Sequence, residues 1–141
     1  MREVNIKILG TQEDQLGEKE TVEMVTSARY YRKNGIDYLL YEESEISGME
    51  GSRTSLKIEK NRVLMNRTGS IEAKMDFMEK YESSFLYKSQ FGTFNMQVTT
   101  DKLEVSMKEA LNESKISVAY VLKIAGNDFE SRNRLSIEIL G

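Results

Sequence analysis

The chain contains no cysteine and no histidine among its 141 residues. Without cysteine it can form no disulfide, thiolate nucleophile, iron–sulfur cluster or cysteine-ligated zinc site. Without histidine it lacks the commonest general base and metal ligand, which excludes a serine–histidine triad and a histidine-ligated transition metal. Carboxylates could still hold Mg²⁺ or Ca²⁺, but no aspartate-rich calcium loop occurs. We therefore predict no cofactor and no metal.

Proline is also absent, and no hydrophobic run approaches the length of a membrane span. Residues 1–10, MREVNIKILG, alternate polar and apolar side chains and lack the apolar core of a signal peptide. We therefore expect a cytoplasmic protein that does not associate with a membrane.

Positive charge is not in excess: 20 lysines and arginines face 23 aspartates and glutamates, and the pI is near 5.2. This balance does not suit a general nucleic-acid binder, whose affinity depends on neutralising phosphates. Residues 29–33, RYYRK, are the nearest approach to a basic patch, and they are too few and too mixed in phase. Nucleic acid is therefore not a predicted partner.

Alternation of apolar and polar side chains dominates the chain, and turn residues interrupt it every eight to twelve positions or so. Residues 54–58 and 116–124 alternate most clearly, and Asn34-Gly35 is a strong hairpin signal. The 141 residues have the size and the 39% hydrophobic content of one domain, 1–141. We predict an all-β antiparallel meander of roughly eight to ten strands, closed into a barrel because open edges invite aggregation.

Two segments, 71–82 and 99–111, fit a helical stripe as well as a strand. We predict a strand for the first seven or eight residues of each, with room for a helical turn after it. Residues 81–87 are polar and aromatic, which suits a connection or a short edge strand.

Loosely spaced positions give a family resemblance. They are Tyr41-x-Glu43, Thr54-x-x-Lys57, Arg67-x-Gly69, Met75-x-Phe77, Tyr87-x-Ser89-x-Phe91-Gly92, Met96-x-Val98-x-Thr100 and Tyr120. Through them most of the chain resembles the YwiB-like family of uncharacterised bacterial proteins. The resemblance implies a calycin-like barrel of eight or slightly more strands, similar in shape to lipocalins, and a bacterial cytoplasmic origin. It implies no activity.

Arg67 is the sharpest candidate for a functional residue, because it shares a phase with Val63 and Met65. If those side chains point inward, the guanidinium lies inside the barrel or at its mouth. An unpaired buried charge is costly, so Glu43, Glu42 or a bound anion should meet it. An Arg–Glu bridge closing the barrel, a ligand anchor, and a solvent position caused by a bulge all remain open.

Tyr38 and Tyr41 flank this position on opposite phases of one strand. Each hydroxyl could bond a carboxylate ligand, or each ring could simply fill the core. The candidate ligand-binding set is Arg67, Glu43, Tyr41, Thr54, Tyr38 and Met65. We expect the acidic run 42–45 to be a solvated strand end.

Eight methionines are a high number for this length, and several occupy plausible inward positions: Met24, Met65, Met75, Met96 and Met107. Methionine adapts to irregular spaces, so these side chains could line an apolar pocket. They fit a filled core equally well, since an eight-stranded barrel is just narrow enough to pack solid.

Three functions follow from this pattern. The first is a binding module for a small apolar or carboxylate-bearing, partly anionic ligand in the barrel mouth. The second is a filled barrel that acts through its outer surface, as a homodimer, with an apolar patch near Leu39 or Val121. The third is a histidine-free enzyme of decarboxylase type, by analogy with phenolic acid decarboxylases, which use Tyr, Arg and Glu in a barrel mouth; a fold does not imply a function. We favour a protein that is not an enzyme.

Overall fold

The computed structural model describes residues 1–141, and ten antiparallel strands account for most of the chain. They are β1 (Arg2–Asp14), β2 (Lys19–Lys33), β3 (Ile36–Glu42), β4 (Ser52–Glu59), β5 (Arg62–Gly69), β6 (Ala73–Phe77), β7 (Glu82–Ser89), β8 (Gly92–Ser106), β9 (Lys115–Ile124) and β10 (Glu130–Ile139). A 3-10 turn, η1 (Leu111–Glu113), lies between β8 and β9. The spatial order is β6-β5-β4-β3-β2-β1-β10-β9-β8-β7. The predicted all-β antiparallel fold is confirmed.

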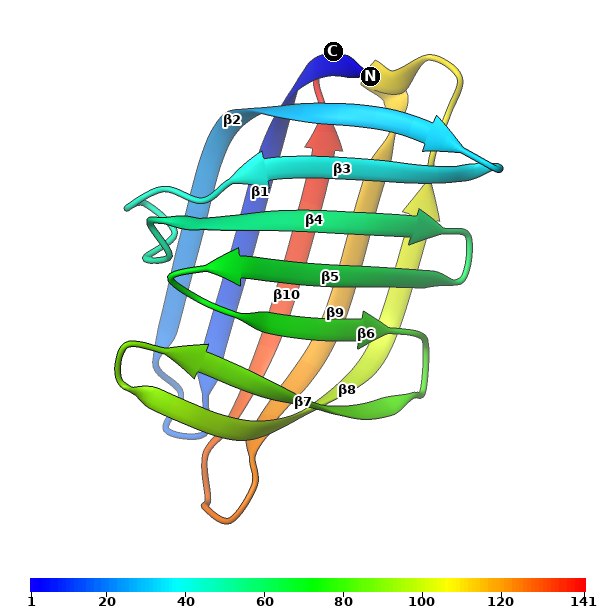
Figure 1. The fold of residues 1–141 in the computed structure, drawn as a ribbon. Helices are drawn as coiled ribbons and strands as arrows, with labels where there is room; N and C mark the ends of the chain where they lie inside the picture. The colour runs from blue at the N-terminus through cyan, green and yellow to red at the C-terminus, as the bar shows by residue number, and fades with distance from the viewer.

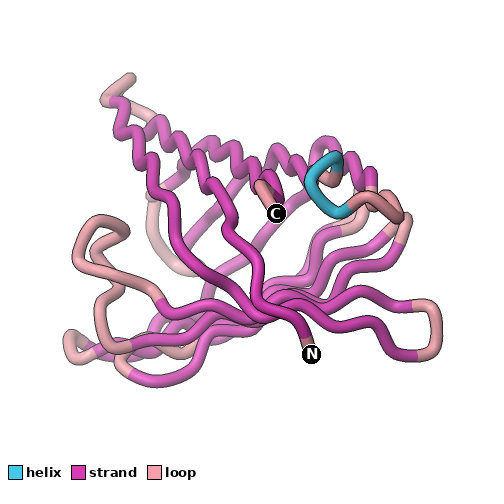
Figure 2. Tube along the Cα trace, turned by 90° about the horizontal axis from the view of Figure 1, so that it is seen from above, coloured by secondary structure: helices cyan, strands magenta, loops and turns pink.

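Two layers of strands cross at a steep angle: β3–β6 run across one face, and β1, β10 and β9 run behind them (Figure 1). The view from above shows the same two layers and their connections (Figure 2). The long strands β2 and β8, of fifteen residues each, pass from one layer to the other. β2 pairs with β1 over residues 19–30 but with β3 only over residues 29–33. Residues 19–28 of β2 therefore have a strand partner on one side only.

The barrel closes only loosely between the two end strands. Glu72, just before β6, and Lys88 in β7 form an isolated antiparallel bridge with backbone N···O distances of 2.9 and 2.8 Å. The gap between β2 and β3 and this single bridge make the barrel nearly closed rather than continuous.

One end of the interior is filled with apolar side chains. Twenty-three buried hydrophobic residues form a single cluster that extends through the interior. At its filled end a void of only about 10 Å³ remains. The residues around that void are Leu56, Val63, Met65, Phe77, Leu103, Ile116, Val118, Leu135 and Ile137. Leu39 belongs to the same cluster and is fully buried, so the expectation of a surface patch at Leu39 is wrong; Val121 is half-buried.

The two ambiguous segments are strands. β8 continues to Ser106 and the helical turn is the short η1, while β6 takes five residues of the segment 71–82. Residues 82–89 form an eight-residue edge strand rather than a connection, because Phe85 is buried while Ser84 and Leu86 face solvent. The structure contains no helix with the length and apolar character needed to cross a membrane.

Candidate ligand-binding site

The candidate site begins with one row of inward-facing side chains across four strands. Tyr41 of β3 lies opposite Thr54 of β4, which lies opposite Arg67 of β5, which lies opposite Ala73 of β6. Glu43 follows β3 directly and continues the phase of Tyr41. The small Ala73 leaves space beside the arginine. Alternation along each strand thus brings four of the six predicted residues together.

Thr54 links the two charged side chains of this row. Its hydroxyl donates a hydrogen bond to Glu43 Oε1 at 2.7 Å and accepts one from Arg67 Nε at 3.2 Å. Arg67 Nε lies 3.8 Å from Glu43 Oε1. The side chains of Arg67 and Glu43 are only 12% and 2% exposed, so solvent screens this ion pair weakly. Of the alternatives left open for Arg67, the structure contains the ion pair with a glutamate, and the partner is Glu43 rather than Glu42.

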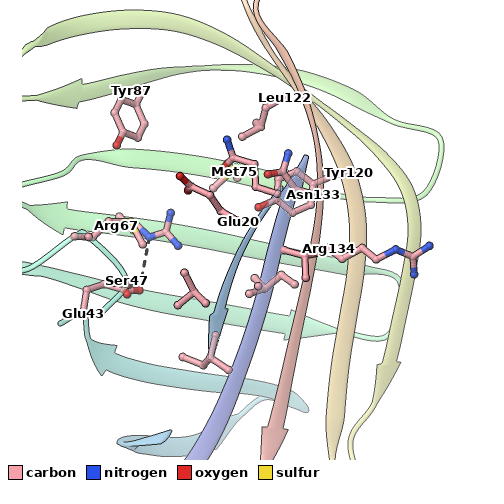
Figure 3. Close-up of a pocket in the computed structure, with 18 of the residues that line it drawn as sticks. Glu20, Glu43, Ser47, Arg67, Met75, Tyr87, Tyr120, Leu122, Asn133 and Arg134 are labelled. Atoms are coloured by element: carbon pink, nitrogen blue, oxygen red, sulfur yellow. Dashed lines mark ion pairs between the residues drawn. The ribbon is translucent and has the colours of Figure 1, made fainter. Parts of the chain in front are cut away.

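The guanidinium is held by its Nε atom alone. Neither Nη group of Arg67 donates a hydrogen bond within the chain, and both belong to a side chain that lines a cavity. In Figure 3 the guanidinium extends into that cavity, with Glu43 below it at the other end of the dashed line and Tyr87 above it. A guanidinium can bind a carboxylate through two parallel N–H donors. In Arg67 the two Nη groups are free to act as such a pair.

The buried Tyr41 and the partly buried Tyr120 add hydrogen-bonding groups to the same cavity. Burial raises the pKa of Tyr41, and the neighbouring Glu43 carboxylate raises it further, whereas Arg67 lowers it. Burial also raises the pKa of Tyr120, again against a lowering by Arg67. Both phenols are therefore neutral at physiological pH and can donate a hydrogen bond to an oxygen of a ligand.

The cavity has a volume of about 360 Å³, near the lower end of small-molecule sites. It occupies the end of the barrel opposite to the filled core, beside the gap between β2 and β3. Its polar wall carries Arg67, Glu43, Tyr41 and Tyr120, with Tyr87, Asn133 and Glu20 nearby. Its apolar wall consists mainly of Met24, Met49, Met75, Met96, Phe85 and Leu122. The barrel is thus filled at one end and hollow at the other.

Two predicted site residues lie elsewhere. Tyr38 points to the outer face of the barrel, where its ring stacks on Tyr31 with centroids 4.6 Å apart. The prediction for Tyr38 is wrong because it has the opposite phase to Tyr41. Met65 is inward but packs in the filled end, one inward position before Arg67, so it does not line the cavity.

Sequence reasoning missed several polar side chains of the cavity, among them Glu20, Tyr87, Tyr120 and Asn133. Glu20 continues the inward phase of Val22 and Met24, so its position was recoverable from period alone. Asn133 is buried and donates hydrogen bonds to the Ser131 backbone and side chain. No local pattern places it opposite Tyr120, because that pairing depends on the β9–β10 register.

Comparisons with known proteins agree with this architecture. The profile of a family described as "Domain of unknown function (DUF1934)" matches residues 6–137. The chain is 26% identical over 125 residues to "Uncharacterized beta-barrel protein YwiB" of Bacillus subtilis (strain 168), covering 89% of this chain and 84% of that protein. A crystal structure of the ywiB protein from Bacillus subtilis matches with a TM-score of 0.76 at 22% identity, covering 97% of this chain and 92% of that one. The structural likeness concerns the fold.

Proposed function

Since this chain belongs to the family described as a domain of unknown function (DUF1934), as the predicted YwiB-like resemblance implied, we propose a function from the site itself. The protein binds a small, partly apolar, carboxylate-bearing molecule inside the hollow end of its barrel. Arg67 anchors the carboxylate, and the methionine-rich wall receives the apolar body. The protein acts as a binding module.

The free Nη groups of Arg67 are the observation that carries this proposal. A filled barrel needs no arginine 88% removed from solvent beside a cavity of about 360 Å³. If Arg67 served only to bridge Glu43, solvent in the cavity would be the only partner of its Nη groups, which make no hydrogen bond within the chain and are not among its buried, unpaired polar atoms. A carboxylate bound to both Nη atoms satisfies them, while the Glu43–Thr54 pair keeps the guanidinium in place.

The opposite wall supports an apolar ligand body that is not of one fixed shape. Met24, Met75 and Met96 are buried, and Met49 comes from the loop between β3 and β4. Methionine side chains rearrange readily around an irregular guest and contact aromatic rings favourably. Burying apolar ligand surface there contributes about 25 cal/mol per Å².

Native mass spectrometry of the purified protein tests the proposal, with Arg67→Met as the variant. We expect wild-type protein to carry a small molecule that denaturation releases, and Arg67→Met to carry none. Arg62→Met is the matched control: Arg62 is on the same strand, faces outward and pairs with Asp76 at 2.8 Å. Bare wild-type protein that also takes up no carboxylate from a small-molecule extract would contradict the proposal.

A further inference from the structure

Glu20 is an exposed, charged side chain at the end of an inward row that is otherwise uncharged. On β2 the inward phase runs through Ala28, Thr26, Met24 and Val22 to Glu20, which lines the cavity from the edge that faces the β2–β3 gap. In Figure 3 its side chain extends from β2 over the cavity toward the wall with Arg67. Glu20 takes part in none of the ion pairs of the structure.

Of the four charged residues that line the cavity, Arg67 and Glu43 pair with each other at 3.8 Å. Arg134 and Glu20 are both exposed and lie at the rim, and the Arg134 side chain runs away from the guanidinium of Arg67 (Figure 3). Glu20 extends over the cavity instead, so it places a negative charge without an ion-pair partner at the cavity mouth. A ligand with only a carboxylate would bring a second negative charge toward it, which is unfavourable.

A ligand that carries a positive group as well as a carboxylate can pair with both Glu20 and Arg67. We propose that the molecule bound in the cavity is a small amphipathic zwitterion, with its carboxylate on the Nη groups of Arg67 and its ammonium group at Glu20. This inference rests on the proposed function, because it needs the same cavity and the same anchor. It assigns to Glu20 the role of a specificity-determining residue: the carboxylate selects ligands with an amino group.

Calorimetric titration of ligand-free protein with three probes tests the inference. Phenylalanine carries both charged groups, 3-phenylpropanoate lacks the ammonium group, and 2-phenylethylamine lacks the carboxylate, while the apolar body stays nearly the same. We expect phenylalanine to bind about tenfold tighter than 3-phenylpropanoate, since a charge-assisted hydrogen bond is roughly twice as strong as a neutral one. Added salt should narrow this difference, because the mouth of the cavity is accessible to ions.

Glu20→Gln should bring the affinities for phenylalanine and 3-phenylpropanoate to within about twofold of each other. It weakens the binding of the first and strengthens that of the second, because it removes a charge that attracts the ammonium group and repels a ligand with only a carboxylate. Glu23→Gln is the matched control, since Glu23 lies on the same strand but faces outward and pairs with Lys7 at 3.1 Å. Arg67→Met should weaken both carboxylate-bearing probes.

Two outcomes overturn the inference and leave the proposed function standing. The first is equal binding of phenylalanine and 3-phenylpropanoate by wild-type protein. The second is a Glu20→Gln variant that keeps the full preference for phenylalanine. Failure of all three probes to bind overturns the inference as well. Unchanged binding of 3-phenylpropanoate by Arg67→Met would instead overturn the proposed function, since the anchor would then be dispensable.

Discussion

Glu42 and Glu43 are adjacent in the sequence and occupy opposite environments. The Glu42 side chain is 75% exposed and pairs with Arg53 on the surface, whereas the Glu43 side chain is 2% exposed and pairs with Arg67. The expectation of a solvated acidic strand end holds for Glu42 and is wrong for Glu43. Glu43 shares the inward phase of Tyr41 and Glu42 does not, because every second side chain of a strand enters the barrel.

Glu43→Gln is expected to destabilise the protein by about 2 kcal/mol, because it leaves Arg67 weakly solvated and without a counter-charge. The same exchange at Glu42 should cost less than about 0.5 kcal/mol, as exposed ion pairs usually contribute little. Urea unfolding of the two variants beside wild-type protein measures this difference. Equal losses of unfolding free energy at the two positions would show that the buried ion pair contributes no more stability than the exposed one.

Because of Tyr30, the free energy of unfolding should decrease as the pH rises into the alkaline range. Burial, together with a hydrogen bond donated to Asp37, raises its pKa to about 12. The unfolded value is about 10, so this contribution is complete below about pH 10 and is lost as pH rises toward about 12. Tyr30→Phe should flatten the decline of unfolding free energy over that range. Its effect will be less than the full linkage, because Tyr30 is partly exposed. Parallel declines in wild type and variant would contradict the assignment.

At the scale of the elements, local chemistry predicts turns and phases well. Asn34 and Gly35 have φ angles of 53° and 77°, as the hairpin between β2 and β3 requires. The place where β2 leaves β3 was not predictable, because β2 alternates without interruption through residue 29. Strand bending and twist, which depend on the whole sheet, set that divergence. It is the divergence that opens the cavity.

Gly69 fixes the end of β5 against the loop between β3 and β4. Its φ is +105°, and a Cβ there would lie 2.4 Å from the backbone oxygen of Gly51. Gly126 has a φ of +83° and nothing within 4 Å, so it isolates the cost of the backbone angle alone. We expect Gly69→Ala to destabilise the protein by at least about 1 kcal/mol more than Gly126→Ala. Equal unfolding free energies of the two variants would mean that the loop moves away from the added methyl group at no cost in stability.

The free edge of β2 should be visible by hydrogen exchange. β1 is paired on both sides between residues 6 and 13, while residues 19–28 of β2, which precede Arg29, lack a partner on the β3 side. Alternate amides in residues 19–28 should therefore exchange at least about 100-fold faster than those of β1. Uniform protection of β2 would contradict an open gap. Protection that rises with protein concentration would support the predicted homodimer, formed through this edge.

At the scale of the whole molecule, the sequence left open whether the barrel is solid or hollow. In the structure one end is filled and the other holds a cavity. Methionine content could not separate them, because the same side chain fills a core and lines a pocket. Met65 fills the core, whereas Met24, Met75 and Met96 line the cavity. The calycin-like relation, the decarboxylase alternative and the cytoplasmic location remain predictions. The central claim is that the hollow end binds a carboxylate-bearing molecule.

Methionine-methyl NMR tests this claim most directly, because the eight methionines sample both ends of the barrel. Titration with phenylalanine and with 3-phenylpropanoate should shift the methyl resonances of Met24, Met49, Met75 and Met96, which line the cavity. The resonances of Met65 and Met107, which lie outside it, should stay in place. Saturable shifts confined to the first group, and absent in Arg67→Met, are the result predicted. Unchanged spectra, or shifts spread evenly over both groups, would contradict it.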